Sequence, residues 1–209
     1  MKDLRSGFGE GLVDAGAQNH EVVAVVTQPD RPVGRKNIIT PPPVKVVALE
    51  NDIPVFQYEK IRAEGVEDLK NVGADIMITC AYGQILSKEI IDICPHGIIN
   101  IHASLLPKYR GSSPIQWALI NNEKITGVSV LRSGIGMDDG PVMLERKINI
   151  DKEENAITLF DKLSKLSADM VEETLYLIES GNAIFIDQDE SQLSKCKMLK
   201  SEMGDLDFS

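Results

Sequence analysis

Consecutive apolar positions mark the first half of the chain at residues 22–27, 74–81 and 98–102. Such runs are typical of strands in a parallel sheet that is covered by helices on both faces. The segments between them combine helix-start signals with helical spacing and predict helices at residues 44–51, 61–72, 87–93 and 114–121. Residues 28–40 are predicted to form a long loop, and residues 53–56 a short strand.

The second half has a different pattern. Residues 127–131 and 142–150 alternate between apolar and polar, which indicates an antiparallel pair joined by a loop at 134–140. Residues 156–179 have helical spacing and predict a long amphipathic helix that Gly181 and Asn182 terminate. Together the segments predict an α/β fold: a Rossmann-like, open, mostly parallel sheet with helices on both faces and an antiparallel extension.

The composition is that of a globular chain: 209 residues, of which 43% are hydrophobic and 26% charged. No apolar run approaches the roughly 20 residues of a membrane helix, and the first residues form neither a secretory signal nor a transit peptide. We therefore expect a cytoplasmic protein without a membrane partner. The net charge of −10 argues against general binding of DNA or RNA, although a local basic patch remains compatible with it.

Two further signals exclude common kinds of site. Cys80, Cys94 and Cys196 lack metal-ligand spacing, so we expect reduced thiols and no metal. The glycines within residues 7–11 follow no buried strand and are spaced G-x-G-x-G, unlike a dinucleotide-binding fingerprint. Residues 10–15 are instead expected to form part of a helix.

Residues 98–111 read Ile-Ile-Asn-Ile-His-Ala-Ser-Leu-Leu-Pro-Lys-Tyr-Arg-Gly and carry the candidate chemistry. Asn100 and His102 are two positions apart, so on a strand their side chains project from the same face. An amide can stabilise an oxyanion and an imidazole can move a proton, which is what acyl transfer requires. A hydrogen-bonded pair that caps a strand turn is the alternative interpretation of the same two residues.

This motif resembles the signature of the folate-dependent formyltransferases, in particular the methionyl-tRNA formyltransferases. Three further stretches resemble the same family in the same order: Val-Thr-Gln-Pro-Asp-Arg at 26–31 with Pro-Pro-Pro-Val-Lys at 41–45, Ala-Tyr-Gly-Gln-Ile-Leu at 81–86, and Gly-Met-Asp-Asp-Gly at 136–140. The likeness spans residues 22–191 and implies the Rossmann-like fold named above.

The resemblance implies a catalytic set of Asn100 as oxyanion donor, His102 as the proton-transfer group, and Asp138 as the carboxylate that orients the imidazole. An acidic turn is the alternative for Asp138. The resemblance also implies a site for 10-formyltetrahydrofolate, with no metal. Its implied lining residues are Ala81, Tyr82, Gly83, Gln84, Ile85, Leu86, Ser104, Leu105, Leu106 and Pro107.

The acceptor implied by the resemblance is the amino group of initiator methionyl-tRNA. Arg31, Arg35 and Lys36 stand where the family has a basic loop, and positive charge there suits phosphate contacts. Asp139 and Pro141 depart from the tRNA enzymes and are closer to the glycinamide-ribonucleotide enzymes. A sibling formyltransferase, a formyl-folate hydrolase, or a folate-binding remnant without turnover are therefore alternatives.

Both ends of the chain differ from the family pattern. The family opens with a strand and a Gly-Thr-Pro-type loop, which residues 1–9 do not match, and continues into a barrel-like tRNA-binding domain after a segment that residues 200–209 resemble. We expect a catalytic domain at residues 1–186, followed by an extended tail or linker at 187–209. We also expect weak folding, because strands beside an unfilled position would leave backbone groups unpaired.

Overall fold

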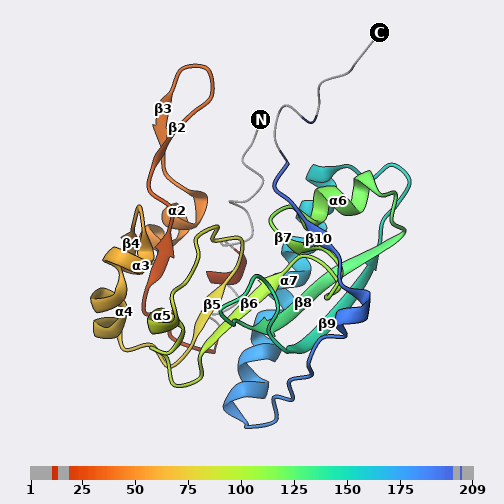
Figure 1. Ribbon diagram of the computed structural model, residues 1–209. Helices are drawn as coiled ribbons and strands as arrows, with labels where there is room; N and C mark the ends of the chain where they lie inside the picture. Colours follow the sequence, from red (N-terminus) through yellow and green to blue (C-terminus); the bar gives the residue numbers. More distant parts are fainter. Residues whose placement is uncertain (1–10, 14–18, 200–202, 204–209) are drawn as a thin grey trace.

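The computed structural model describes residues 11–13, 19–199 and 203. Its main sheet has four strands in the order β5 (Met77–Thr79), β6 (Ile98–His102), β8 (Ile125–Arg132) and β9 (Val142–Asn149), as Figure 1 shows. The β5–β6 pair is parallel, whereas β8 pairs antiparallel with both β6 and β9. A separate parallel pair joins β1 (Val25–Thr27) to β4 (Val55–Gln57). This arrangement confirms the predicted α/β class with an antiparallel extension.

Six helices lie entirely within the described residues: α2 (Pro43–Glu50), α3 (Ile61–Glu64), α4 (Val66–Val72), α5 (Lys88–Ile91), α6 (Pro114–Ile120) and α7 (Ala156–Glu179). Residues 11–13 are also helical, while the rest of the helix predicted at 10–15 lies outside the described residues. Local signals set several helix ends. Ser87 accepts a hydrogen bond from the Ile90 amide and caps α5, and Asn155 forms a capping box with Thr158 at the start of α7.

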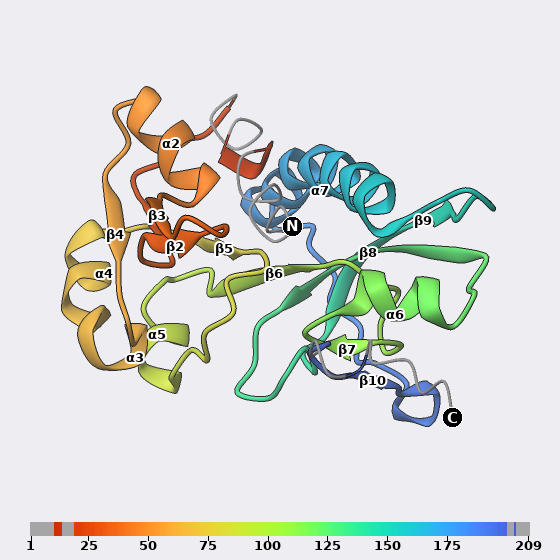
Figure 2. The same ribbon diagram turned by 90° about the horizontal axis from the view of Figure 1, so that it is seen from above.

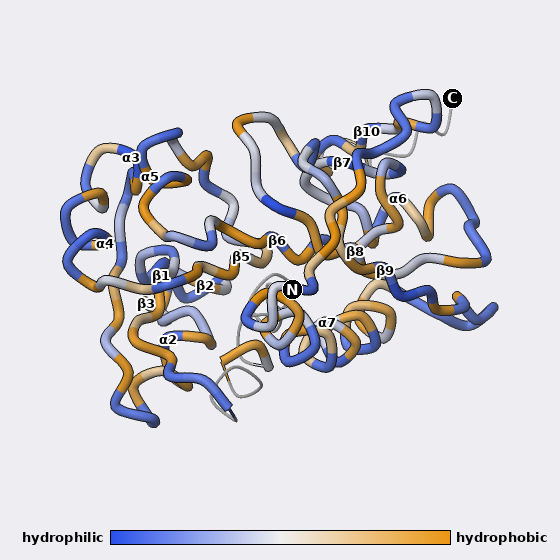
Figure 3. Tube along the Cα trace, turned by 90° about the horizontal axis from the view of Figure 1, so that it is seen from below, coloured by the Kyte–Doolittle hydropathy of each residue, from blue (hydrophilic) through white to orange (hydrophobic). Residues whose placement is uncertain are grey.

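The alternation of side chains on β6 separates two of the three hydrophobic cores of the described residues, the third of which lies between α2 and the β1–β4 pair. Ile99 and Ile101 pack with β8 and with the apolar side of α7, whereas Ile98 packs with α3, α4 and α5. Figure 2 shows α7 lying along the main sheet, with α3, α4 and α5 grouped at the other end of the molecule. In Figure 3, β5, β6 and β8 appear as mainly hydrophobic stretches, while α7 alternates in hydropathy. Helices therefore cover both faces of the sheet, as the sequence predicts.

Residues 28–40 contain a hairpin, so the prediction of a loop without regular structure is wrong. The antiparallel strands β2 (Arg31–Val33) and β3 (Ile38–Thr40) meet in a four-residue turn that includes Gly34 and Asn37, both with positive φ. Figure 1 shows this hairpin projecting away from the rest of the molecule; we call it the arm. Its side chains are exposed, so no alternation toward a core marked it in the sequence.

Two other boundaries differ from the prediction. The helix predicted at 61–72 is divided at Gly65 into α3 and α4, and a Cβ at Gly65 would lie 2.9 Å from the Ile61 side chain, so the close packing there requires glycine. The regular strand β5 is also shorter than the apolar run at 74–81. No helix in the described part of the chain is both long and apolar enough to cross a bilayer.

Residues 187–199, which we call the strap, fold back onto the motif loop instead of extending freely. The short strand β10 (Lys195–Cys196) pairs in parallel with β7 (Arg110–Gly111). A Cβ on Gly111 would lie 2.2 Å from the Cys196 carbonyl oxygen, and φ at Gly111 is +125°, so only glycine permits this approach. The strap therefore closes over the end of the motif. Residues 1–9, on which the expectation of a missing strand rests, lie outside the described residues.

Candidate active site

The register of the main sheet places Asn100 and His102 on the face opposite α7. Asn100 stands across from Leu131 and His102 from Ser129, while the intervening Ile101 points into the α7 core. Both polar side chains thus leave the sheet on one side, as the two-residue spacing predicts. The neighbouring strand supports this arrangement, since the Thr79 hydroxyl donates to Asn100 Oδ1 at 3.1 Å.

Asp138 joins this pair from the loop between β8 and β9. Asn100 Nδ2 donates to Asp138 Oδ1 at 2.9 Å, and Asp138 Oδ2 lies 3.6 Å from His102 Nδ1. The Gly111 amide donates to Oδ2 at 3.0 Å. The three residues implied by the resemblance are therefore adjacent, although 36 or more positions separate Asp138 from the strand pair.

The hydrogen bonds of His102 fix which ring nitrogen carries a hydrogen. His102 Nε2 lies 2.9 Å from the Tyr109 carbonyl oxygen, which can only accept, so Nε2 is the donor. Nδ1 then faces Asp138 and is the nitrogen that can take up a proton. The side chain of His102 is almost entirely enclosed, with 6% of the residue exposed, so the ring has one orientation.

The Asn100 amide is oriented in the same way. Thr79 engages its oxygen and Asp138 one of its two amide hydrogens, which leaves the second hydrogen available for an anionic oxygen. A fixed amide donor beside a base with a carboxylate partner can support acyl transfer through an oxyanion.

The loop at 81–86 follows β5 directly and so begins beside Thr79 and Asn100. Its side chains are divided between two roles. Ile85 is 69% exposed and available to a ligand. Tyr82 and Leu86 pack into the α3–α5 core, and Gln84 is occupied by the Tyr58 carbonyl and the Ile61 amide. Ala81 and Gly83 both have positive φ, so they shape the turn.

The predicted lining at 104–107 is more enclosed than expected. Ser104 is fully buried and donates to the Lys108 carbonyl, and the buried Leu106 donates its amide to Ser129. These two side chains point into the protein. Leu105 instead lines a hollow of about 160 Å³ with Tyr109 and Thr126, and Pro107 follows a cis peptide bond.

The Asp138 loop adds two residues that the sequence analysis did not single out. Ile135 and Met137 are 74% and 64% exposed, although they flank a glycine within the Gly-Met-Asp-Asp-Gly motif. Large apolar side chains exposed on a loop beside a reactive carboxylate are suited to contacting a flat apolar ligand. Met137 lies within that motif and Ile135 directly precedes it, which was the sequence signal that could have identified them.

The three basic residues of the arm differ in their surroundings. Arg31 pairs with Glu59 at 2.7 Å, near the base of the arm. Arg35 and Lys36 lie in the exposed turn between β2 and β3, and the described residues provide neither with an ion pair. The structure therefore leaves two of the three predicted cations available to an anionic partner.

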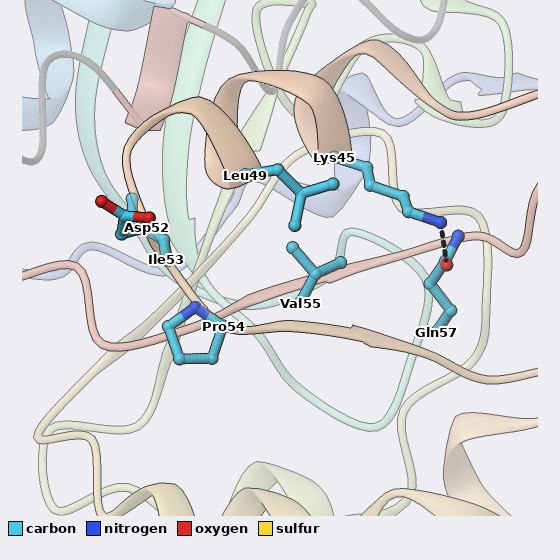
Figure 4. Close-up of a pocket in the computed structure, with 7 residues that line it drawn as sticks. All are labelled: Lys45, Leu49, Asp52, Ile53, Pro54, Val55 and Gln57. Carbon is cyan, nitrogen blue, oxygen red and sulfur yellow. Dashed lines mark hydrogen bonds between the residues drawn. The ribbon is translucent and has the colours of Figure 1, made fainter.

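A second hollow is separate from this set of residues. It has a volume of about 480 Å³, lies between α2 and β4, and contains none of the predicted site residues. Figure 4 shows Lys45 at its rim reaching Gln57, at a distance of 2.7 Å. Lys45 also contacts both Asp30 carboxylate oxygens at 2.9 Å, so its charge is already paired.

Curated relatives at about 45% identity cover nearly the whole of this chain. A methionyl-tRNA formyltransferase from Geobacter sulfurreducens is 45% identical over 199 residues, which cover 95% of this chain and 62% of the relative. The enzyme of the same name from Solibacter usitatus is 46% identical over 201 residues, covering 96% and 64%. The chain thus spans less than two thirds of the length of these relatives.

Solved structures share the fold at lower identity. Glycinamide ribonucleotide transformylase 1 from Symbiobacterium toebii has a TM-score of 0.72 at 19% identity, covering 88% of this chain and 90% of that one. The N-formyltransferase from Helicobacter canadensis, solved with folinic acid and dTDP-3-aminofucose, has a TM-score of 0.72 at 17% identity, covering 92% and 68%. The family model described as "Formyl transferase" matches residues 8–175, which is more than half of the sequence. This chain therefore belongs to the formyl transferase family.

Proposed function

We propose that this chain transfers the formyl group of 10-formyltetrahydrofolate to the amino group of initiator methionyl-tRNA. The adjacency of Asn100, His102 and Asp138 carries the proposal, because these groups suit acyl transfer to an amine. The acceptor is supported by the methionyl-tRNA formyltransferases that are about 45% identical to the chain. We place the reaction in the cytoplasm, where translation initiation would use this product.

The chemistry follows from the orientation of the side chains. The methionyl nitrogen attacks the formyl carbon, a new C–N bond forms, and the carbonyl oxygen becomes an oxyanion that the free Asn100 amide hydrogen can stabilise. The bond from the formyl carbon to N10 of the folate then breaks. The attacking nitrogen loses a proton to His102 Nδ1, and the ring passes this proton to the folate nitrogen as it leaves.

Asp138 contributes through charge. A proton taken up at Nδ1 makes the His102 ring cationic, and this cation faces a carboxylate oxygen 3.6 Å away. Opposite charges at this distance attract, so the carboxylate stabilises the positive charge that develops on the ring during the reaction. The Gly111 amide and the Asn100 amide both donate to the carboxylate and fix its position beside the ring.

The two substrates would approach from different elements. The exposed side chains of Ile85, Ile135 and Met137 offer apolar contacts for the pterin ring, from loops on either side of Asn100. Arg35 and Lys36 on the arm offer contacts to tRNA phosphates.

A turnover assay of the 209-residue chain with formyl-folate and methionyl-tRNA tests the reaction. Asn100→Ala is expected to lower kcat by roughly 100- to 1,000-fold, and His102→Ala by roughly 100- to 10,000-fold, with folate affinity retained. His96→Ala is the matched control, because His96 is an exposed histidine that lies in the turn before β6, outside the site.

The acceptor assignment has its own test. Parallel reactions with glycinamide ribonucleotide, an amino-sugar nucleotide and water alone separate the tRNA enzyme from sibling transferases and from a hydrolase. Folate binding without turnover on any acceptor would support a remnant and contradict the proposed activity. Near-normal turnover in either site variant would contradict the assigned residues.

A further inference from the structure

We propose that Gln188 of the strap is a positioning residue that holds the Asp138 loop against His102, with Arg110 orienting Gln188. The proposal rests on the proposed function and adds to it. Only the kinetic test requires that function to hold, because the spectroscopic test needs no turnover. Gln188 lies 50 positions from Asp138 in the chain and outside the four motifs. It does not contact the reacting atoms.

The side-chain amide of Gln188 spans the loop that carries Asp138. Its Nε2 donates to the Asp138 carbonyl oxygen at 2.9 Å and to the Gly140 carbonyl oxygen at 2.7 Å. Two hydrogen bonds from one nitrogen to carbonyls two residues apart define the path of the loop backbone. The Asp138 side chain leaves the backbone at one of these anchored residues.

The other end of the amide is fixed by Arg110. Gln188 Oε1 accepts from Arg110 Nε at 2.9 Å and from Nη2 at 2.7 Å, so every polar position of the amide is used. These two bonds also determine which end of the amide faces the loop. Arg110 is only 5% exposed, and its Nη1 and Nη2 atoms also donate to the exposed Glu190.

Asp138 is therefore held from two directions by the same neighbourhood. Gly111, next to Arg110, donates to the Asp138 carboxylate, while Gln188 holds the Asp138 backbone. Asp138 has a φ of +52°, a left-handed conformation that surrounding contacts must maintain in a residue other than glycine. The pairing of β10 with β7 brings the strap into register with this segment.

A purely structural role for the strap makes different predictions from a positioning role. Gln188→Glu separates them, because it retains an acceptor for Arg110 but loses both donors to the loop carbonyls. Glu190→Gln is the matched control, since it weakens the other contact of Arg110 and leaves the loop bonds intact. Gln188→Met provides an uncharged variant of similar size in case the carboxylate prevents folding.

The first readout is independent of catalysis. The sequence contains three histidines, so the ring signals of His102 can be assigned in a ¹H–¹⁵N spectrum with His20→Gln, His96→Gln and His102→Gln reference variants. We expect Gln188→Glu and Gln188→Met to shift the His102 signals at fixed pH, while Glu190→Gln leaves them in place. The melting temperature of each variant is measured in parallel.

The second readout is kinetic. We expect Gln188→Glu and Gln188→Met to lower kcat by roughly 10- to 100-fold while the KM values for both substrates stay within about twofold, as for a misplaced catalytic group. Glu190→Gln is expected to retain kcat. Unchanged His102 signals in both Gln188 variants, or equal losses in Glu190→Gln, would overturn the positioning role. If the chain lacks turnover on every acceptor, the spectra still decide this inference, and the proposed function alone fails.

Discussion

At the scale of single residues, the site depends on groups that hold the reactive side chains rather than on those side chains alone. Asn100 has two possible amide orientations, and only one directs a hydrogen toward an oxyanion. The Thr79 hydroxyl selects that orientation by donating to Oδ1 at 3.1 Å. Its other nearby acceptor, the Ile99 carbonyl, is more distant at 3.5 Å. Thr79 is therefore a determinant of amide orientation that lies outside the recognised motifs.

Replacement of Thr79 tests this dependence. Thr79→Val keeps the shape of the side chain but removes the donor, so we expect kcat to fall about fivefold, corresponding to one ordinary hydrogen bond of about 1 kcal/mol. Thr79→Ser retains the hydroxyl and is expected to stay close to the parent rate. Steady-state kinetics of the two variants provide the comparison, and equal rates in both would remove Thr79 from the site.

At the scale of secondary-structure elements, the arm combines an anchored base with an unpaired tip. Lys45 of α2 contacts Asp30 just before β2, and its hydrogen bonds hold the pKa of Asp30 below its ordinary value. Gln57 of β4 donates to the same carboxylate and to the Gln28 carbonyl. The base is thereby tied to the parallel strand pair, whereas the turn extends into solvent.

The positive charge at the tip of the arm predicts that tRNA binding depends on the salt concentration. Arg35→Ala is expected to raise the KM for tRNA, leave folate binding unchanged, and reduce the slope of log affinity against log salt by roughly one contact. The defect should shrink at high salt because phosphate contacts are then screened. Arg62→Ala, an exposed arginine on α3, is the control. An equal defect toward a minimal amine acceptor would contradict phosphate binding by the arm.

At the scale of the whole molecule, burial of a thiol and a phenol predicts that the free energy of unfolding decreases at alkaline pH. Burial raises the pKa of the Cys80 thiol from 9.0 to about 12, because the thiolate is poorly solvated in the core. Tyr82 is raised to about 12 for the same principal reason. Both groups are neutral when protonated, so folding favours the protonated form.

The direction of the pH effect follows from proton binding. Between about pH 9 and pH 12 the unfolded chain releases the Cys80 proton while the folded chain retains it, so the free energy of unfolding falls as the pH rises. We expect Cys80 to account for about 1.5 kcal/mol of the loss between about pH 8 and pH 10. Urea unfolding under reducing conditions measures it. Cys80→Ala should show a correspondingly smaller change, and an identical change in both proteins would contradict the assignment.

Elements with local signals could be predicted from the amino-acid sequence. The apolar run at 98–102 is a strand with these bounds, and the helix predicted at 156–179 also has its predicted bounds. Ser87 caps α5 at the start of the helix predicted at 87–93. Residue spacing alone also placed Asn100 and His102 on one face. Each of these features depends on neighbours within a few positions, which periodicity and capping describe directly.

Contacts between distant elements depend on the tertiary structure and did not follow from local patterns. The contact of Asp138 with Asn100 spans 38 positions, and it was expected only through a family resemblance. Thr79 and Gln188 had no such signal, because their roles depend on strand register and on a strap that folds back over β7. Local patterns state which side chains share a face, but hydrogen bonds between distant segments depend on how the assembled sheet and loops place them. The candidate pair on one strand could therefore be predicted from the sequence, whereas the orientation of its side chains depends on the fold.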